Sequence, residues 1–176
     1  MIFCNVRLRS TDQFLQSARF IDPCFPGIRS FPARHTTRIT IGVATTFTVE
    51  ALNQITSTII AGAIKVHRTL GPGLLENAYL ACMCHELAAV GLRFETQKAL
   101  PFFYNGTRID CAYRADLIVE QAVIVEVKAV DAIPAVYTRQ LRTYAKLADC
   151  RVGLLLNFGA PTLKDGIKRV VNGFPA

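Results

Sequence analysis

The sequence predicts an α/β fold in which α-helices flank a mixed β-sheet. Apolar residues recur every three or four positions in several stretches, which is typical of amphipathic helices. Between these stretches lie short, continuous apolar runs that are typical of buried strands. The two kinds of segment share a chain of 176 residues, a length that suits one domain with a sizeable core.

The first two elements of the domain are predicted to be helices. An amphipathic helix is expected to end at Gly71-Pro72-Gly73, because glycine and proline terminate helices. Its apolar positions are Leu52, Ile55, Ile59, Ala63, Val66 and Leu70. A second helix is expected from about Leu74 to Val90, with Gly91 as its stop.

Three strands are expected next. Residues 92–104 and 107–119 have strand-like patterns, and Asn105-Gly106 between them is a strong signal for a β-hairpin. Residues 122–127 (AVIVEV) follow closely and indicate a largely buried strand.

The remaining chain is predicted to form a helix, a strand and a closing helix. Residues 133–148 have a helical period, residues 152–158 (VGLLLNF) indicate another buried strand, and residues 163–171 are expected to form a short helix. The resulting order of helix, helix, three strands, helix, strand and helix describes a mixed sheet with flanking helices.

Residues 1–49 differ from the rest and are interpreted as an irregular N-terminal extension. They hold six arginines, no lysine and only two acidic residues, so they carry more than half of the formal charge of +7. Such an Arg-rich, acid-poor composition is typical of a mitochondrial transit peptide. A poorly ordered tail, or sequence upstream of the true start, is favoured over that alternative because no period persists. The basic charge alone is therefore weak evidence for nucleic-acid binding.

Neither a membrane span nor a cysteine-based metal site is expected. No stretch approaches 18 uninterrupted apolar residues. The six cysteines show no C-x-x-C spacing, and Cys82 and Cys84 would point to different sides of their helix. Reduced thiols in a cytoplasmic protein are the expected state.

Asp116, Glu126 and Lys128 form the sharpest candidate site. Glu126 and Lys128 are two residues apart on an apolar strand, so they project from the same face. Two carboxylates brought together repel each other unless a cation lies between them, and oxygen ligands suit Mg²⁺ or Mn²⁺. The alternative is a surface hairpin with an ordinary Glu–Lys pair.

The register between the two strands decides whether the carboxylates meet. A two-residue loop at Glu120-Gln121 would place Asp116 opposite Val125 instead of Glu126. A three-residue loop, a bulge or a diagonal approach through strand twist is therefore required.

Two further groups of polar residues lie on predicted helices. Gly73, Glu76 and Tyr79 are spaced by three at the start of the second helix, although an acid there is also explained by the helix dipole. Tyr137, Gln140 and Tyr144 share one helix face; aromatic residues at this spacing usually belong to a core, and Gln140 is the unexpected member.

These motifs together resemble those of the GxxExxY protein family, whose name is the pattern of Gly73, Glu76 and Tyr79. The family belongs to the PD-(D/E)XK nuclease-like superfamily. The resemblance implies a restriction-endonuclease-like fold for residues 50–176. It covers about residues 52–174 and rests on the segments IIAGAIKVHRTLGPGLLENAYLACMCHEL, YRADLIVEQAVIVEVKAV, RQLRTYAKL and VGLLLNFG.

The resemblance also implies roles for single residues. Asp116 corresponds to the aspartate of the superfamily motif and Glu126 and Lys128 to its E-x-K, although Ala115 stands where the name-giving proline is expected. Mg²⁺, or Mn²⁺, would be held by carboxylates and one backbone carbonyl; the implied ligands are Glu76, Asp116, Glu126 and Val127. Lys128 would position water or stabilise charge, and Gln140 would orient Lys128 or the phosphate. His67 and Arg114 are further candidates for phosphate contacts, with a structural role equally expected for His67.

The function expected from the residues and the resemblance is a metal-dependent nuclease acting on DNA in preference to RNA. The alternative is a non-catalytic member that binds nucleic acid or protein, since residues 50–176 carry only a modest positive charge for tight duplex binding. A small-molecule phosphoesterase also stays open. A homodimer is a further expectation, because members of the superfamily often pair.

Overall fold

The computed structural model describes residues 47–173, so all but the end of the extension expected over residues 1–49 lies outside the described part. The elements are α1 (Val49–Leu70), α2 (Glu76–Ala89), β1 (Phe94–Tyr104), β2 (Thr107–Val119), β3 (Val123–Lys128), α3 (Ala135–Leu147), β4 (Val152–Asn157), the short 3₁₀ helix η1 (Leu163–Gly166) and β5 (Ile167–Val171). The helix–helix–three-strand–helix–strand order predicted from the sequence is confirmed up to β4.

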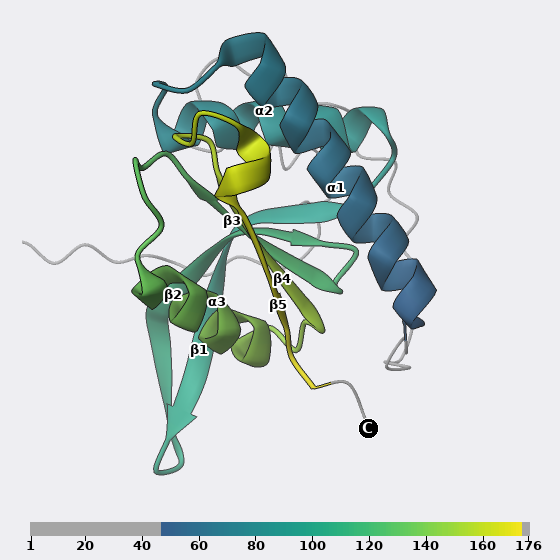
Figure 1. Ribbon diagram of the computed structural model, residues 1–176. Coiled ribbons are helices and arrows are strands. Elements are labelled where there is room, and N and C mark those ends of the chain that lie inside the picture. Colours follow the sequence, from purple (N-terminus) through teal and green to yellow (C-terminus); the bar gives the residue numbers. More distant parts are fainter. Residues whose placement is uncertain (1–46, 174–176) are drawn as a thin grey trace, which may run out of the picture. The chain divides into compact units, whose positions relative to one another are not determined.

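The five strands form one mixed sheet in the order β1-β2-β3-β4-β5. Only β3 and β4 run parallel, because α3 connects them as a crossover; the other neighbours are antiparallel. The helices α1 and α2 lie on one face of the sheet and α3 on the other (Figure 1). The expected α/β architecture of a mixed sheet flanked by helices is therefore confirmed.

The core has two layers because β3 and β4 are buried on both faces. Val125 and Leu154 face α1 and α2, whereas Ile124 and Leu155 face α3. Such continuous apolar strands, rather than alternating ones, are expected where helices cover both faces of a sheet.

The short helix expected over residues 163–171 is wrong. The chain makes only one 3₁₀ turn, and Ile167–Val171 then pairs with β4 as the edge strand β5. The physical reasons are the β-branched residues of the segment and the free edge of β4, whose backbone groups need partners. A helix of that length would also be marginal by itself.

The predicted hairpin turn and the predicted end of the first helix are confirmed. Asn105 and Gly106 both have positive φ (47° and 77°), as the hairpin requires. Thr48 caps α1 through its hydroxyl, and Gly71 ends α1 with its N–H donated to the carbonyl of His67.

Cys82, Cys84 and Cys150 are free thiols. Within residues 47–173, none of the helices combines the length and the apolar character that a membrane span requires.

Candidate active site

The site lies where β2 and β3 separate. Val119 pairs with Val123, so a three-residue loop connects the strands, and Glu120 and Gln121 in it have φ of 51° and 54°. This is the loop length that aligns Asp116 with Glu126. The ladder ends at Leu117 and Val125, immediately before the two carboxylates meet. We refer to this opening, formed by Asp116 on β2 and Glu126–Lys128 on β3, as the fork.

Carboxylates replace the missing ladder hydrogen bonds at the fork. The N–H of Val127 donates to Oδ2 of Asp116 (2.9 Å), and the N–H of Asp116 donates to Oε1 of Glu126 (3.4 Å). Each carboxylate thus binds the backbone of the opposite strand. The two strands stay close enough to keep both acids together but too far apart for regular pairing.

Gln97 holds Asp116 from the other side. It lies on β1 between the pairs Thr96–Leu117 and Lys98–Ala115, and its Nε2 donates to Oδ1 of Asp116 (3.0 Å). Its φ of 50° is uncommon for a residue with a side chain and costs roughly 1–3 kcal/mol. Such strain inside a strand is typical of functional sites. Gln97 was not predicted as a site residue, because a glutamine within the polar stretch ETQK is typical of an ordinary surface position.

Glu126 is buried, with 6% of its surface exposed. Burial raises the pKa of its carboxyl to about 8, and the neighbouring Asp116 carboxylate adds to this shift, whereas Lys128 opposes it. Glu126 therefore holds its proton at neutral pH more readily than an exposed glutamate does. Raised pKa values of this kind are common where a site is arranged for chemistry instead of stability.

Lys128 supplies the positive charge of the fork. Its Nζ lies 3.6 Å from Oε2 of Glu126 and 3.7 Å from Oε2 of Glu76, and 5.8 Å from the ring centre of Tyr137. Burial lowers the pKa of Lys128, but the surrounding carboxylates outweigh burial and hold the pKa above its ordinary value. Lys128 is therefore cationic at neutral pH.

Glu76 reaches the fork from the first turn of α2. Its Oε1 also accepts the N–H of Ala129 (3.3 Å), so it contacts the chain directly after β3. Three acids from three elements, namely Glu76, Asp116 and Glu126, thus surround one ammonium group.

The loop in front of Glu76 is held by Tyr79. The phenol donates to the carbonyl of Gly71 (2.6 Å) and accepts the N–H of Leu74 (3.1 Å). Tyr79 is fully buried, and its ring stacks on Phe158 with 4.4 Å between the ring centres. Gly73 has a φ of 109°, which favours glycine. In the G-x-x-E-x-x-Y pattern, the glycine thus permits the turn, the glutamate reaches the site and the tyrosine fixes the loop between them.

The sequence matches the PD-(D/E)XK nuclease superfamily over residues 53–170, which is more than half of the chain. The chain belongs to this superfamily. Its mixed sheet with flanking helices is the restriction-endonuclease-like α/β fold.

One solved structure, described as the crystal structure of SSO0001, is similar to this chain with a TM-score of 0.36 and 18% sequence identity. The similarity covers 70% of this chain but 63% of that one, less than two thirds of its length. No curated protein matches the chain.

Gln140 and Val127, two further predicted residues of this PD-(D/E)XK protein, have other partners in the structure. Gln140 donates from Nε2 to the hydroxyl of Tyr144 (2.6 Å) on the next turn of α3, while Tyr137 is the residue of α3 that lies over Lys128. The N–H of Val127 is bound by Asp116. The orienting role of Gln140 and the metal contact of the Val127 carbonyl stay predictions.

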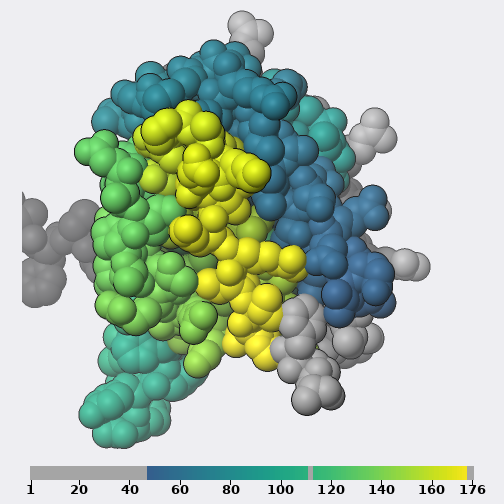
Figure 2. Space-filling model, in the orientation of Figure 1, coloured from purple at the N-terminus to yellow at the C-terminus, as the bar shows by residue number. Residues whose placement is uncertain are grey.

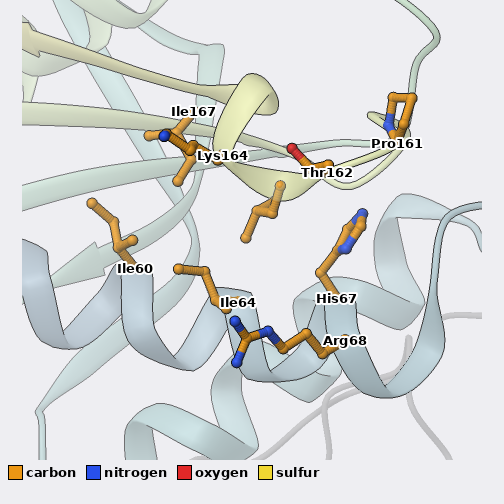
Figure 3. A pocket seen from close by; sticks show the side chains of 9 residues that line it. Ile60, Ile64, His67, Arg68, Pro161, Thr162, Lys164 and Ile167 are labelled. Carbon is orange, nitrogen blue, oxygen red and sulfur yellow. The ribbon is translucent and has the colours of Figure 1, made fainter.

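His67 contacts the backbone of the segment after β4. Its Nε2 donates to the carbonyl of Ala160 (2.9 Å), and the histidine lines an apolar groove between α1 and the segment around η1 (Figure 3). Ile60 and Ile64 line the same groove. The geometry therefore gives His67 a structural contact, whereas Arg114 is exposed on β2.

The chemistry of the fork fits a divalent cation, although its acids are now bound to other groups. Within residues 47–173, no three His, Cys, Asp or Glu side chains are arranged as a complete set of metal ligands. Asp116 is engaged by Gln97 and a backbone N–H, and Glu76 by Ala129. The three carboxyl groups nevertheless form a set of hard oxygen donors, which favours Mg²⁺ or Mn²⁺. A single lysine lies between them, and one of the acids, Glu126, has its pKa raised to about 8.

Proposed function

We propose that this chain is a metal-dependent nuclease of the GxxExxY family that hydrolyses phosphodiester bonds of nucleic acid, with DNA preferred over RNA. The observation that supports this most is the pair of carboxylates at the fork, Asp116 and the buried Glu126, next to a cationic Lys128. A purely structural protein gains nothing from placing two repelling acids where a sheet opens.

The proposed mechanism assigns metal binding to Asp116, Glu126 and Glu76, with the carbonyl of Val127 as a further ligand. A bound Mg²⁺ or Mn²⁺ supplies Lewis-acid chemistry, which lowers the pKa of water and polarises the phosphodiester. Lys128 holds its positive charge at neutral pH and lies where it can position the attacking water or stabilise charge on the phosphoryl oxygens. Tyr137 restricts the ammonium from one side, and Gln97 fixes the orientation of Asp116.

The test is cleavage of end-labelled single-stranded, double-stranded and branched DNA, and of RNA, by the purified full-length chain with Mg²⁺, Mn²⁺ or EDTA. We expect metal-dependent cleavage that Asp116→Asn and Lys128→Ala each lower by at least about 100-fold, the size typical of lost transition-state stabilisation. Glu95→Gln, a change in an exposed acid of β1, is the matched control. Cleavage that survives both EDTA and Lys128→Ala would reject the mechanism.

A non-catalytic binding module is the second candidate. It is favoured by one observation: both oxygens of Asp116 already accept hydrogen bonds, from Gln97 and from the backbone of Val127. Binding of nucleic acid without cleavage of any of these substrates, in either metal, would support this candidate.

A further inference from the structure

A row of aromatic side chains leads away from the fork on the α3 side of the sheet. The Tyr144 ring centre lies 5.3 Å from that of Tyr113, and Tyr113 lies 6.0 Å from Phe102. Tyr104 is two residues beyond Phe102 on β1 and therefore projects from the same face. We call these four residues, Tyr144, Tyr113, Phe102 and Tyr104, the aromatic row.

The aromatic row begins at the site and becomes more exposed along its length. Tyr144 is buried, and the Glu126 carboxylate is among the groups that raise the pKa of its phenol, after burial itself. Tyr113 and Phe102 are half-buried, and Tyr104 has 66% of its surface exposed. The row thus connects the catalytic acids with the end of the β1–β2 hairpin.

The hairpin has no core of its own around this end. Figures 1 and 2 show it projecting beyond α3 and the rest of the sheet, at the lower left. Tyr104 stands on this projecting end with 66% of its surface exposed. Exposed aromatic side chains on a projecting hairpin can serve as a binding surface.

The helix that packs beside the row carries exposed basic residues. α3, which packs against the base of the hairpin, contains Arg139, Arg142 and Lys146 and no acidic residue. All three are exposed on the face of α3 that is turned away from the sheet, and none of them forms an ion pair within residues 47–173. This charge complements a phosphate backbone.

We propose that the accessible rings of the aromatic row, Tyr113, Phe102 and Tyr104, form a stacking surface for the unpaired bases of a single-stranded nucleic acid, to whose phosphates the exposed cations of α3 add a general attraction. Duplex bases have no free faces and would use only the basic residues, whereas unpaired bases stack on aromatic rings irrespective of sequence. The strand from Asp116 to Thr107 spans roughly 30 Å at about 3.3 Å per residue, which accommodates several stacked bases. The preferred substrate is thus a single strand, or a duplex with a single-stranded end. This rests on the proposed function only in placing the scissile bond at the fork.

The experiment is fluorescence anisotropy of labelled dT20, a blunt 20-base-pair duplex and the same duplex with a dT20 overhang, all in EDTA so that nothing is cleaved. Tyr104→Leu and Phe102→Leu in the full chain should each weaken dT20 and overhang binding by about 5- to 100-fold, since one stacked base contributes about 1–3 kcal/mol. Blunt-duplex binding should change less than about twofold. Tyr104→Phe should bind like the wild type because it keeps the ring.

Phe103→Leu is the matched control. Phe103 is as exposed as Tyr104 but projects from the opposite face of the hairpin, paired with Arg108, so its replacement should leave dT20 binding within about twofold. Circular dichroism and thermal unfolding of each variant show whether the hairpin change left the domain folded.

Three outcomes would overturn the proposal: unchanged dT20 affinity in the row variants, equal losses for single strand and duplex, or an equal loss in Phe103→Leu. Light scattering after size exclusion tests a second copy of the chain as occupant; a dimer that Tyr104→Leu dissociates without changing dT20 affinity per chain would also overturn it. The proposed function would fail by a different result: no cleavage of any substrate, although dT20 still binds.

Discussion

The two edges of β3 differ in how completely they are paired with neighbouring strands. Toward β4, all six residues Val123–Lys128 are paired in a regular parallel ladder. Toward β2, only three positions are paired, and the remaining edge opens into the fork, where side-chain carboxylates bind the backbone. In the proposed function, β3 contributes stability along one edge and the site's chemistry along the other, so substitutions on the two edges should have opposite effects on stability.

The largest expected effect on stability lies on the β4 edge. Leu154 is fully buried in the layer facing α1 and α2, so Leu154→Ala removes apolar contacts and leaves a cavity. We expect the free energy of unfolding to fall by about 2–5 kcal/mol, measured by urea denaturation. A loss below about 1 kcal/mol would show that this edge does not carry the stability of the domain.

On the fork edge, Glu126→Gln should increase stability. The folded-state pKa of Glu126 is about 8, above its ordinary value of 4.5, so the folded protein holds a proton that the unfolded chain releases between these pH values. The stabilisation from this protonation is full below pH 4.5 and is lost as pH rises through 8. Gln cannot ionise and avoids this loss, which amounts to a few kcal/mol because one pKa unit corresponds to about 1.4 kcal/mol.

Thermal unfolding of wild type and Glu126→Gln between pH 4.5 and 8.5, in EDTA, measures this difference. The gain in the variant should grow with pH and nearly vanish at pH 4.5. A constant difference, or a variant that is less stable at pH 8, would contradict the account of the fork as a strained site.

Tyr79→Phe tests the loop that presents Glu76. The variant keeps the stacking on Phe158 but leaves the carbonyl of Gly71 and the N–H of Leu74 without the hydroxyl. We expect a loss of about 1–2 kcal/mol in unfolding free energy, together with weaker Mn²⁺ binding, because Glu76 is less well held. Val136→Ala, an exposed change on α3, is the control. Unchanged Mn²⁺ affinity in Tyr79→Phe would show that the loop held by Tyr79 does not contribute to metal binding.

The smallest effect on stability is expected at Gln97. Glycine adopts the φ of 50° without strain, so Gln97→Gly should leave stability within about 1 kcal/mol of the wild type or slightly above it. Lys98→Gly, at the next position of β1, has no such strain to relieve and should destabilise by about 0.5–1 kcal/mol. Cleavage should fall about 10-fold in Gln97→Gly only, because Asp116 loses its amide partner.

Most of the fold followed from local patterns. The helical periods of α1 and α3, the Asn105-Gly106 hairpin and the apolar runs of β3 and β4 each indicate their element without reference to distant residues. The strand β5 was not predicted, because an edge strand of five residues depends on a partner strand that its own sequence does not reveal. Its β-branched residues were the available signal.

Those site residues could be predicted that stand out by their charge, whereas those that depend on backbone conformation could not. Glu126 and Lys128 stood out as charges on an apolar strand, and the structure brings them together with Asp116 and Glu76. The role of Gln97 depends on a backbone angle and on cross-strand register, which no local pattern encodes.

Asn157 was missed for a related reason. Buried at the end of β4, it donates to and accepts from the backbone of Val130 and so fixes the loop that follows Lys128. Its two hydrogen bonds to Val130 depend on the parallel alignment of β3 with β4, which the apolar run VGLLLNF does not specify.

The most direct test of the central claim, that the fork binds a divalent cation, is calorimetric titration of Mn²⁺ into the wild type, Glu126→Gln and the control Glu120→Gln at pH 7. Glu120 lies beside the fork in the β2–β3 loop but is paired with Arg93, so its change should leave the affinity within about twofold. We predict measurable binding to the wild type that Glu126→Gln weakens at least about 10-fold. Equal affinity in the wild type and Glu126→Gln, or no binding to either, would contradict the account.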